Sequence, residues 1–226
     1  MRNRSWLIGI CFLIMIACYD LERVEGYFMN IAEKYIKGIS EAYIKTGRTE
    51  EWDEFVDTMH GASDEDLQEI KNIYPDCPSS LLALLKFADG TYYRKYGDKT
   101  VLLYFLGSDV EEYQYPYYLL SSKEIIKNQH IARGFSDDIE GAYDRVGVDD
   151  KITDKTDVIK WLHFSDCMNN GGSSQLFIDF SPSASGKTGQ IVRFLHDPDE
   201  LVVIADSFDS YLEMLIKNDY AFIYEE

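Results

Sequence analysis

The segment with the most recognisable chemistry runs from Ser181 to Thr188 and ends in Gly-Lys-Thr. A glycine-rich loop with this ending cradles phosphates in P-loop proteins when another glycine begins it and a helix follows it. Here Ser181 stands where the first glycine is required, and the chain continues into the strand-like run Ile191–Leu195. The segment is therefore predicted to be a polar hairpin loop that carries Lys187, and no cofactor is expected.

Histidines are the next candidates for acid–base or metal chemistry. They lie far apart, with no His-x-x-x-His pair and no carboxylates at ligand spacing, at His60, His130, His163 and His196. His196-Asp197 is the one dyad, but it precedes Pro198, where a turn needs polar residues anyway. Asn169–Gly172 could bind an anion, although a tight turn explains it better. We predict no catalytic residues and no metal ligands, and a hydrolase built on His196-Asp197 is the remaining alternative.

Acidic residues beside tyrosines form the candidate binding site. The predicted protein-binding residues are Asp109, Glu111, Glu112, Tyr113, Tyr115 and Tyr117, with Tyr118 following them. Aromatic rings supply contact area at protein interfaces, and carboxylates steer a basic partner toward them. An ordinary solvated loop explains the same pattern equally well, because the sequence does not tell whether these tyrosines are buried.

The overall charge limits the classes of partner. Of 226 residues, 40 are acidic and 22 are basic, which gives a net charge of −18. Such a surface repels phosphate backbones and anionic lipid headgroups, so we expect no nucleic-acid binding and no membrane-surface binding. A basic protein partner suits it, and so does solubility alone. Hydrophobic residues make up 46% of the chain, which is enough for a packed core and excludes a disordered protein.

The N-terminal residues resemble an export signal. Trp6–Cys18 carries no charge and follows two arginines, a length that suits the core of a signal peptide better than a transmembrane helix. The end of this run, Met15-Ile-Ala-Cys18, loosely resembles the cleavage site of a bacterial lipoprotein. A protein anchored by a lipid at Cys18 in the cell envelope is therefore one interpretation, and only then would residues 1–18 bring it to a membrane.

The favoured interpretation is a cytoplasmic protein whose translation starts at Met29, so that residues 1–28 do not belong to it. Val24-Glu-Gly26 can be encoded by bases that contain a bacterial ribosome-binding sequence, at an ordinary distance before the Met29 codon. The four cysteines form no Cys-x-x-Cys pair, which argues against a zinc site or a disulfide framework and favours a reducing compartment.

Hydrophobic periodicity predicts mainly helices in the first half of the chain and mainly strands in the second. The expected helices are Met29–Thr46, one through Trp52–Met59, one from the cap Ser63 to Ile73, Leu81–Ala88, one that begins at Ser121-Ser122, and a last one capped by Ser207. The expected strands are Val101–Leu106, Leu176–Phe180, Ile191–Leu195 and Leu201–Ala205. Short strands separated by turns predict an antiparallel meander. The fold class is thus a single α+β domain over residues 49–226, mainly an antiparallel sheet flanked by helices, with residues 29–48 as a helical extension.

Ordered motifs between about Trp52 and Ile216 resemble the SUKH superfamily, which includes the yeast Smi/Knr cell-wall regulators and many bacterial immunity proteins. The matching residues are Tyr74-Pro75, Pro78–Phe87 with Asp89-Gly90, Trp161–Phe164, Asp166, Asn170–Gly172, Leu176–Asp179, Pro182, Gly186, Gly189–Ile191, His196-Asp197 and Ser207-Phe208. We expect most of them to hold the fold, as core residues, turns and a helix cap, and do not transfer them as a binding site.

The resemblance implies a protein-binding domain without enzymatic activity. Bacterial members are similar to antidotes that bind and block a toxin, often a nuclease, and an acidic blocker can imitate the phosphates for which a nuclease groove is built. The leading hypothesis is therefore an immunity protein that neutralises a basic toxin domain. The alternative is a regulatory or scaffolding module that binds a host protein, with no toxin involved.

Overall fold

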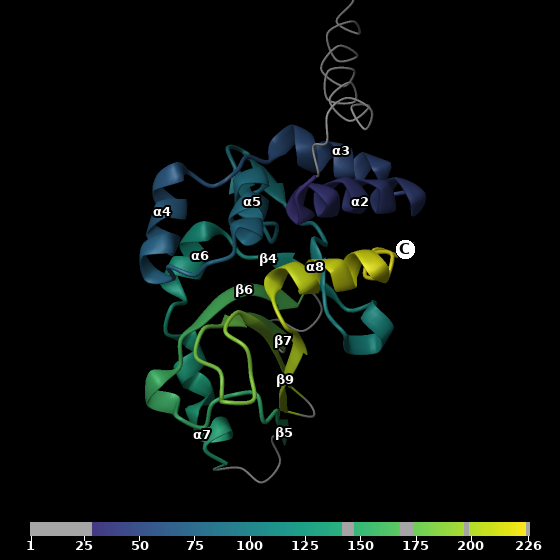
Figure 1. Ribbon diagram of the computed structural model, residues 1–226. Coiled ribbons are helices and arrows are strands. Elements are labelled where there is room, and N and C mark those ends of the chain that lie inside the picture. The colour runs from purple at the N-terminus through teal and green to yellow at the C-terminus, as the bar shows by residue number, and fades with distance from the viewer. Residues whose placement is uncertain (1–28, 142–146, 168–173, 197–198, 225–226) are drawn as a thin grey trace, which may run out of the picture. The chain divides into compact units, whose positions relative to one another are not determined.

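The computed structural model describes residues 29–141, 147–167, 174–196 and 199–224. Residues Ile31–Glu226 form one compact unit of the chain. Its described residues form seven α-helices, three short 3-10 helices and two β-sheets (Figure 1). The predicted single α+β domain is confirmed.

The larger sheet holds seven strands in the order β3-β4-β6-β7-β8-β9-β5, and all neighbours are antiparallel except β5 and β9. The strands are β3 (Leu106–Gly107), β4 (Pro116–Leu119), β5 (Gly147–Val148), β6 (Trp161–Cys167), β7 (Ser174–Asp179), β8 (Gln190–Leu195) and β9 (Glu200–Ala205). Strands β6 to β9 follow one another in the chain and in the sheet. The predicted meander is therefore confirmed.

The smaller sheet is a hairpin of β1 (Arg94–Tyr96) and β2 (Lys99–Val101). The expected strand Val101–Leu106 is wrong, because its two ends belong to different sheets. The residues between them bond to different segments: the Leu103 amide donates to the Thr91 carbonyl, and the Phe105 amide donates to the Tyr117 carbonyl.

The helices lie largely where periodicity predicts them. They are α2 (Ile31–Lys45), α3 (Thr49–Thr58), α4 (Asp64–Ile73), α5 (Ser79–Phe87), α6 (Ser122–Lys127), α7 (Ser136–Ile139) and α8 (Phe208–Lys217), with the 3-10 helices η1 (Val110–Tyr113), η2 (Ile131–Phe135) and η3 (Thr156–Val158). Ser63, Ser121 and Ser207 each accept a backbone N–H from the first turn, which confirms the predicted caps Ser63 and Ser207 and the predicted start of a helix at Ser121-Ser122. No helix in the described ranges is long and apolar enough to cross a membrane.

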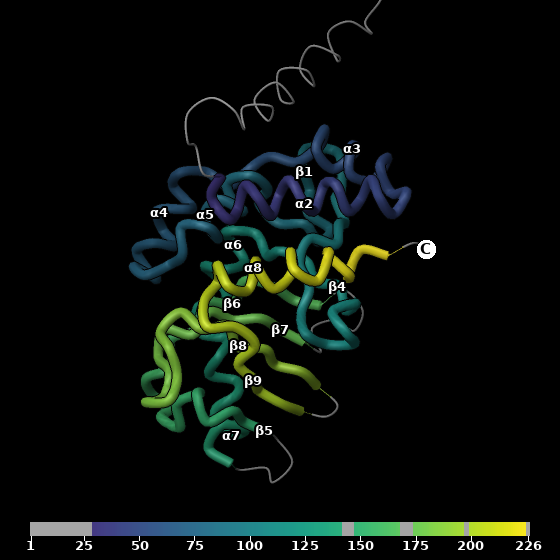
Figure 2. The backbone as a smooth tube through the Cα atoms, turned by 45° about the vertical axis from the view of Figure 1, so that its right-hand side comes forward, coloured from purple at the N-terminus to yellow at the C-terminus, as the bar shows by residue number. Residues whose placement is uncertain are grey.

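One face of the larger sheet carries the main hydrophobic core. Helix α8 lies between the strands and α2, as Figure 2 shows, and it contacts α2, β8 and β9. The apolar stripe of α2 is buried there, and the Tyr35 hydroxyl donates to the Phe105 carbonyl at 2.7 Å. Fully burying a large apolar side chain contributes about 1.5–3 kcal/mol, so this stripe holds α2 firmly on the domain.

The opposite face of the sheet carries a smaller core. Successive strand residues point to opposite faces, so Leu176 joins the main core while Phe177 packs with Phe135, Ile139 and Trp161 from the other side. Both faces are therefore covered in the middle of the sheet. Polar side chains capable of binding have to lie in its loops and along its margins.

Candidate functional site

The loop between β3 and β4 holds the acidic residues that the sequence singled out. Asp109 follows β3 closely, and its carboxylate accepts a hydrogen bond from Arg193 Nε at 2.7 Å. Arg193 lies on β8, so the contact joins positions 84 residues apart. We name Asp109–Tyr113 the acidic loop.

Arg193 is the anchor of the acidic loop. Its side chain is only 5% exposed, and its Nη2 also donates to Glu200 on β9 at 2.6 Å. Burial disfavours the charged guanidinium, but Asp109 and Glu200 outweigh burial, and the pKa of Arg193 is raised. The anchor therefore stays charged and holds the start of the loop against the sheet.

Beyond this anchor the backbone adopts a left-handed conformation. Glu111, Glu112 and Tyr113 have φ angles of 50°, 56° and 71°. Such angles are uncommon for residues other than glycine, asparagine or aspartate, and each costs on the order of 1–3 kcal/mol. Backbone strain of this kind concentrates at functional sites. Its effect here is to leave two consecutive glutamates exposed in the loop.

The tyrosines after the acidic loop are placed differently from the carboxylates. Tyr115 and Tyr117 are buried, and the Tyr117 hydroxyl bonds to Ser174 on β7. Tyr118 is also buried, and its hydroxyl donates to Asp166 on β6 at 3.1 Å. Only Tyr113 keeps part of its ring accessible, so the expected aromatic contact area is reduced to that residue. That this loop binds a protein stays a prediction.

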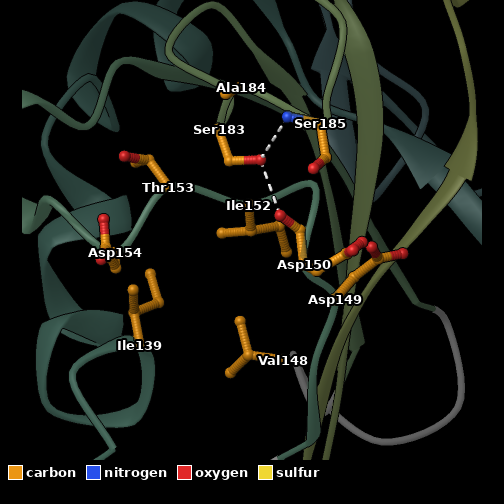
Figure 3. Close-up of a pocket in the computed structure, with 10 residues that line it drawn as sticks. All are labelled: Ile139, Val148, Asp149, Asp150, Ile152, Thr153, Asp154, Ser183, Ala184 and Ser185. Atoms are coloured by element: carbon orange, nitrogen blue, oxygen red, sulfur yellow. Dashed lines mark hydrogen bonds between the residues drawn. The ribbon is translucent and has the colours of Figure 1, made fainter.

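A second acidic feature, missed in the sequence, is a pocket of about 380 Å³ (Figure 3). Ile139, Val148 and Ile152 form its apolar part, and three carboxylates line it from Asp149, Asp150 and Asp154. Ser183–Ser185 from the β7–β8 loop close another side, and Ser183 Oγ donates to the Asp150 carbonyl at 2.6 Å. We name this feature the acidic pocket.

The carboxylates of the acidic pocket divide into one structural group and two free ones. Asp149 accepts backbone N–H groups from Lys151 at 3.0 Å and Val203 at 3.2 Å, and so ties the segment to β9. Asp150 and Asp154 are exposed, and their carboxylates make no ion pair within the described ranges. The apolar floor and the two free carboxylates suit the stem and charged end of a lysine or arginine side chain.

The histidine most capable of chemistry is buried. His163 bonds through Nε2 to Asp166 Oδ1 at 2.8 Å and through Nδ1 to the Asn128 amide at 3.1 Å. Asp166 also accepts from Gln175 at 3.0 Å and from the Tyr118 hydroxyl at 3.1 Å. No local sequence pattern indicates this network, because its members come from β4, β6, β7 and the end of α6.

The network stabilises the ionised form of Asp166. Burial opposes ionisation, but the hydrogen bonds from His163, Gln175 and Tyr118 outweigh burial, and the pKa of Asp166 is lowered. His163 is only 1% exposed, so it does not reach a substrate. Within the described residues the network is a structural element of the sheet.

The other sequence candidates are isolated. His196 is exposed and contacts Asp199, whereas its expected partner Asp197 lies outside the described residues, as does the turn at 169–172. The P-loop look-alike joins β7 to β8, which confirms a hairpin loop, and its Lys187 pairs with Asp206. No group of three possible metal ligands gathers in the described ranges.

Comparison with known proteins identifies one family. The model of the SMI1 / KNR4 family (SUKH-1) matches residues 61–214, which include α4 to α7, the whole larger sheet and most of α8. A search of curated proteins gives no significant match. The matched region contains the acidic loop and the acidic pocket.

Proposed function

The chain belongs to the SMI1 / KNR4 family (SUKH-1), and from this premise we propose that it is an immunity protein that binds and neutralises a bacterial toxin. The coarser part of this function, an immunity or regulatory domain, is consistent with the family. The finer part of the proposal is that the target is a basic toxin domain, such as a nuclease. The charge and geometry of the acidic loop and the acidic pocket support it.

The observation that carries the proposal is the display of Glu111 and Glu112. Their carboxylates project from a strained turn whose start is fixed by the buried Arg193. A loop backbone that is already held in place loses less freedom on binding, and two neighbouring negative charges speed the encounter with a positively charged partner. The acidic loop thus combines long-range attraction with a preformed shape.

The acidic pocket gives the proposal a second contact. A basic side chain of the partner can place its apolar stem on Ile139 and Ile152 and its charge beside Asp150 and Asp154. Buried anchors in pockets supply much of the affinity of protein interfaces, while exposed charges mainly set the association rate. We therefore assign steering to the acidic loop and side-chain anchoring to the pocket.

The experiment first asks whether a secreted toxin is encoded beside this gene, and then takes the purified toxic domain of that toxin as the partner. Association rates are measured at low and high salt for the wild type and for Glu111→Lys/Glu112→Lys. Asp109 is left intact, since it holds Arg193 in place. We expect association to slow about tenfold at low salt and to lose most of its salt dependence.

The matched control is Asp53→Lys/Glu69→Lys, which makes the same charge change on exposed positions of α3 and α4. It should alter the association rate by less than about twofold, because it leaves the local patch intact. Equal effects of the two variants would remove the acidic loop from the interface. A chain that binds a host protein but does not protect cells from the toxin would support the regulatory alternative.

The proposed compartment is the cytoplasm. Cys77 is a free thiol, and burial raises its pKa to about 12, which makes it unreactive. Fractionation of native cells and the intact mass of the chain test this assignment. A membrane-bound form lipidated at Cys18 would contradict it and would require a toxin that acts in the cell envelope.

A further inference from the structure

A pocket of about 390 Å³ with the opposite charge lies between the β1 strand and α6. Its lining combines two tyrosines, four basic residues, one serine and one glutamate: Tyr92, Tyr93, Arg94, Lys95, Ser121, Lys123, Glu124 and Lys127. We name it the basic pocket. It is a local reversal of charge on a chain whose net charge is −18.

Two of the charged groups in the basic pocket are already occupied. Arg94 donates to the buried carboxylate of Asp89 at 2.7 Å, and Glu124 accepts from the Ser121 backbone and hydroxyl at 2.8 and 2.7 Å in a helix capping box. The three lysines are exposed, and none of them pairs with an acidic side chain within the described ranges. Lys95, Lys123 and Lys127 are thus three positive charges without an ion-pair partner around one hollow, against the single carboxylate of Glu124.

The aromatic side of the basic pocket is also prepared for contact. Tyr92 stacks on Tyr118 with ring centroids 4.0 Å apart and planes 12° apart, and Tyr93 meets the Tyr92 ring edge-on. Tyr93 is 62% exposed and has a φ angle of 44°. A strained backbone therefore displays a large ring to solvent beside the lysines, where burial by a partner would be favourable.

We propose that the basic pocket binds an acidic peptide segment of a protein partner. The lysines reach it from two separate elements, β1 and α6, and the one arginine is held by Asp89, so no fork of donors converges on a single phosphate. Separated point charges instead match several carboxylates spaced along a peptide, and Tyr93 suits an apolar side chain between them. This inference goes beyond toxin neutralisation and does not depend on it.

The net charge does not prevent such binding. At physiological ionic strength the Debye length is about 8 Å, so charges elsewhere on the surface are largely screened at the pocket. The approach of an acidic segment is slowed by the whole molecule, whereas its bound state is governed by the nearby lysines. We therefore expect the affinity for an acidic peptide to be no higher at very low salt concentration than at moderate salt concentration. The affinity for a basic partner should instead rise as the salt concentration falls.

The test measures fluorescence anisotropy of a labelled peptide of alternating glutamate and leucine, titrated with the whole chain. Lys123→Glu/Lys127→Glu should weaken binding about tenfold, which is about 1.4 kcal/mol. Lys34→Glu/Lys217→Glu is the matched control, since it places the same changes in the first turns of α2 and the last turn of α8. It should change the affinity by less than about twofold.

A second variant separates binding from folding. Tyr93→Gly removes the ring and relieves the strain of the left-handed backbone at this position. It should therefore lower the affinity for the peptide about fivefold without loss of stability. Equal affinity of the wild type and both pocket variants overturns the proposal. Preference for inorganic phosphate, for vesicles of anionic lipid, or for the corresponding lysine–leucine peptide also overturns it.

Discussion

The acidic loop and the basic pocket are built alike but carry opposite charges. In each, residues with left-handed backbone angles display side chains to solvent, Glu111 and Glu112 in one and Tyr93 in the other. In each, charge of the opposite sign lies beneath: the buried Arg193 under the acidic loop, and the buried Asp89 with the largely buried Asp166 under the basic pocket. A buried ion thus positions a surface whose charge is opposite to its own.

The acidic loop and the aromatic side of the basic pocket differ in how directly the ion beneath holds them. Arg193 bonds to Asp109, which is itself part of the acidic loop. Asp166 acts through the Tyr118 hydroxyl, and Tyr118 in turn carries Tyr92 by ring stacking. Loss of Arg193 should therefore destabilise the acidic loop outright, whereas loss of the Asp166 charge should loosen the basic pocket without collapse, because Asp89 still holds Arg94.

The largest effect is expected when Arg193 loses its partners. Asp109→Asn/Glu200→Gln leaves a buried guanidinium without a compensating charge and should lower the free energy of unfolding by about 3 kcal/mol. Urea denaturation measures this loss. Glu111→Gln is the control, because Glu111 lies in η1 and does not bond to Arg193. It should change the free energy of unfolding by less than about 0.5 kcal/mol. A loss below about 1 kcal/mol in the double variant would mean that Arg193 is not the anchor.

A smaller loss is expected at the ion beneath the basic pocket. Asp166→Asn removes the ionised acceptor of His163, Gln175 and Tyr118 and should cost about 1–2 kcal/mol at neutral pH. Because the folded-state pKa of Asp166 is lowered, its contribution is complete above the ordinary aspartate pKa of about 3.9 and is lost as the pH falls through the folded value. The difference between wild type and variant should therefore shrink in acid.

Asp179 supplies the control for that pH dependence. It is also a buried strand aspartate, but burial dominates over its hydrogen bonds from Ser181 and Gln190, and its pKa is raised. Its ionised form is therefore disfavoured in the folded state. The contribution of Asp179 to stability thus becomes more favourable as the pH falls through its raised folded-state pKa. Parallel pH profiles for Asp166→Asn and Asp179→Asn would contradict the opposite roles assigned to the two residues.

The features that sequence predicts best are those encoded within a few residues. The caps Ser63, Ser121 and Ser207 and the meander from β6 to β9 depend on neighbouring residues and on strand periodicity. The run Val101–Leu106 was misassigned because an uninterrupted apolar run fits one strand as well as the ends of two. Its division is decided by Thr91 and Tyr117, which are distant in sequence.

The binding surfaces could be predicted only in part. The carboxylates Glu111 and Glu112 were identified from their charge, but Tyr115 and Tyr117 look the same in sequence whether they are buried or exposed. Contacts over long separations, such as Asp109 with Arg193, leave no local pattern. The basic pocket could not be predicted from the sequence, because its lysines are interspersed with acidic residues and belong to two elements.

A stabilising effect is expected where strain displays a side chain. Glu112→Gly and Tyr93→Gly should each raise the free energy of unfolding by about 0.5–1 kcal/mol, because glycine adopts positive φ without steric cost. Glu112→Gly should lower only the affinity for the basic partner, and Tyr93→Gly should lower only the affinity for the acidic peptide. Glu69→Gly in the middle of α4 is the control and should destabilise by about 1 kcal/mol. Destabilisation at Glu112 or Tyr93 would show that the native backbone is not strained there.

The smallest effect is expected at a charged residue outside both surfaces. Lys187 lies in the β7–β8 hairpin loop, and although it pairs with Asp206, both side chains are more than half exposed. Solvent screens such a pair, so Lys187→Ala should leave the melting temperature, the association with a basic partner and the affinity for an acidic peptide nearly unchanged. Melting with and without nucleotide completes the measurement. Stabilisation of the wild type by nucleotide that Lys187→Ala abolishes would contradict the hairpin interpretation, because a loop that runs from strand to strand has no helix N-terminus to hold phosphates.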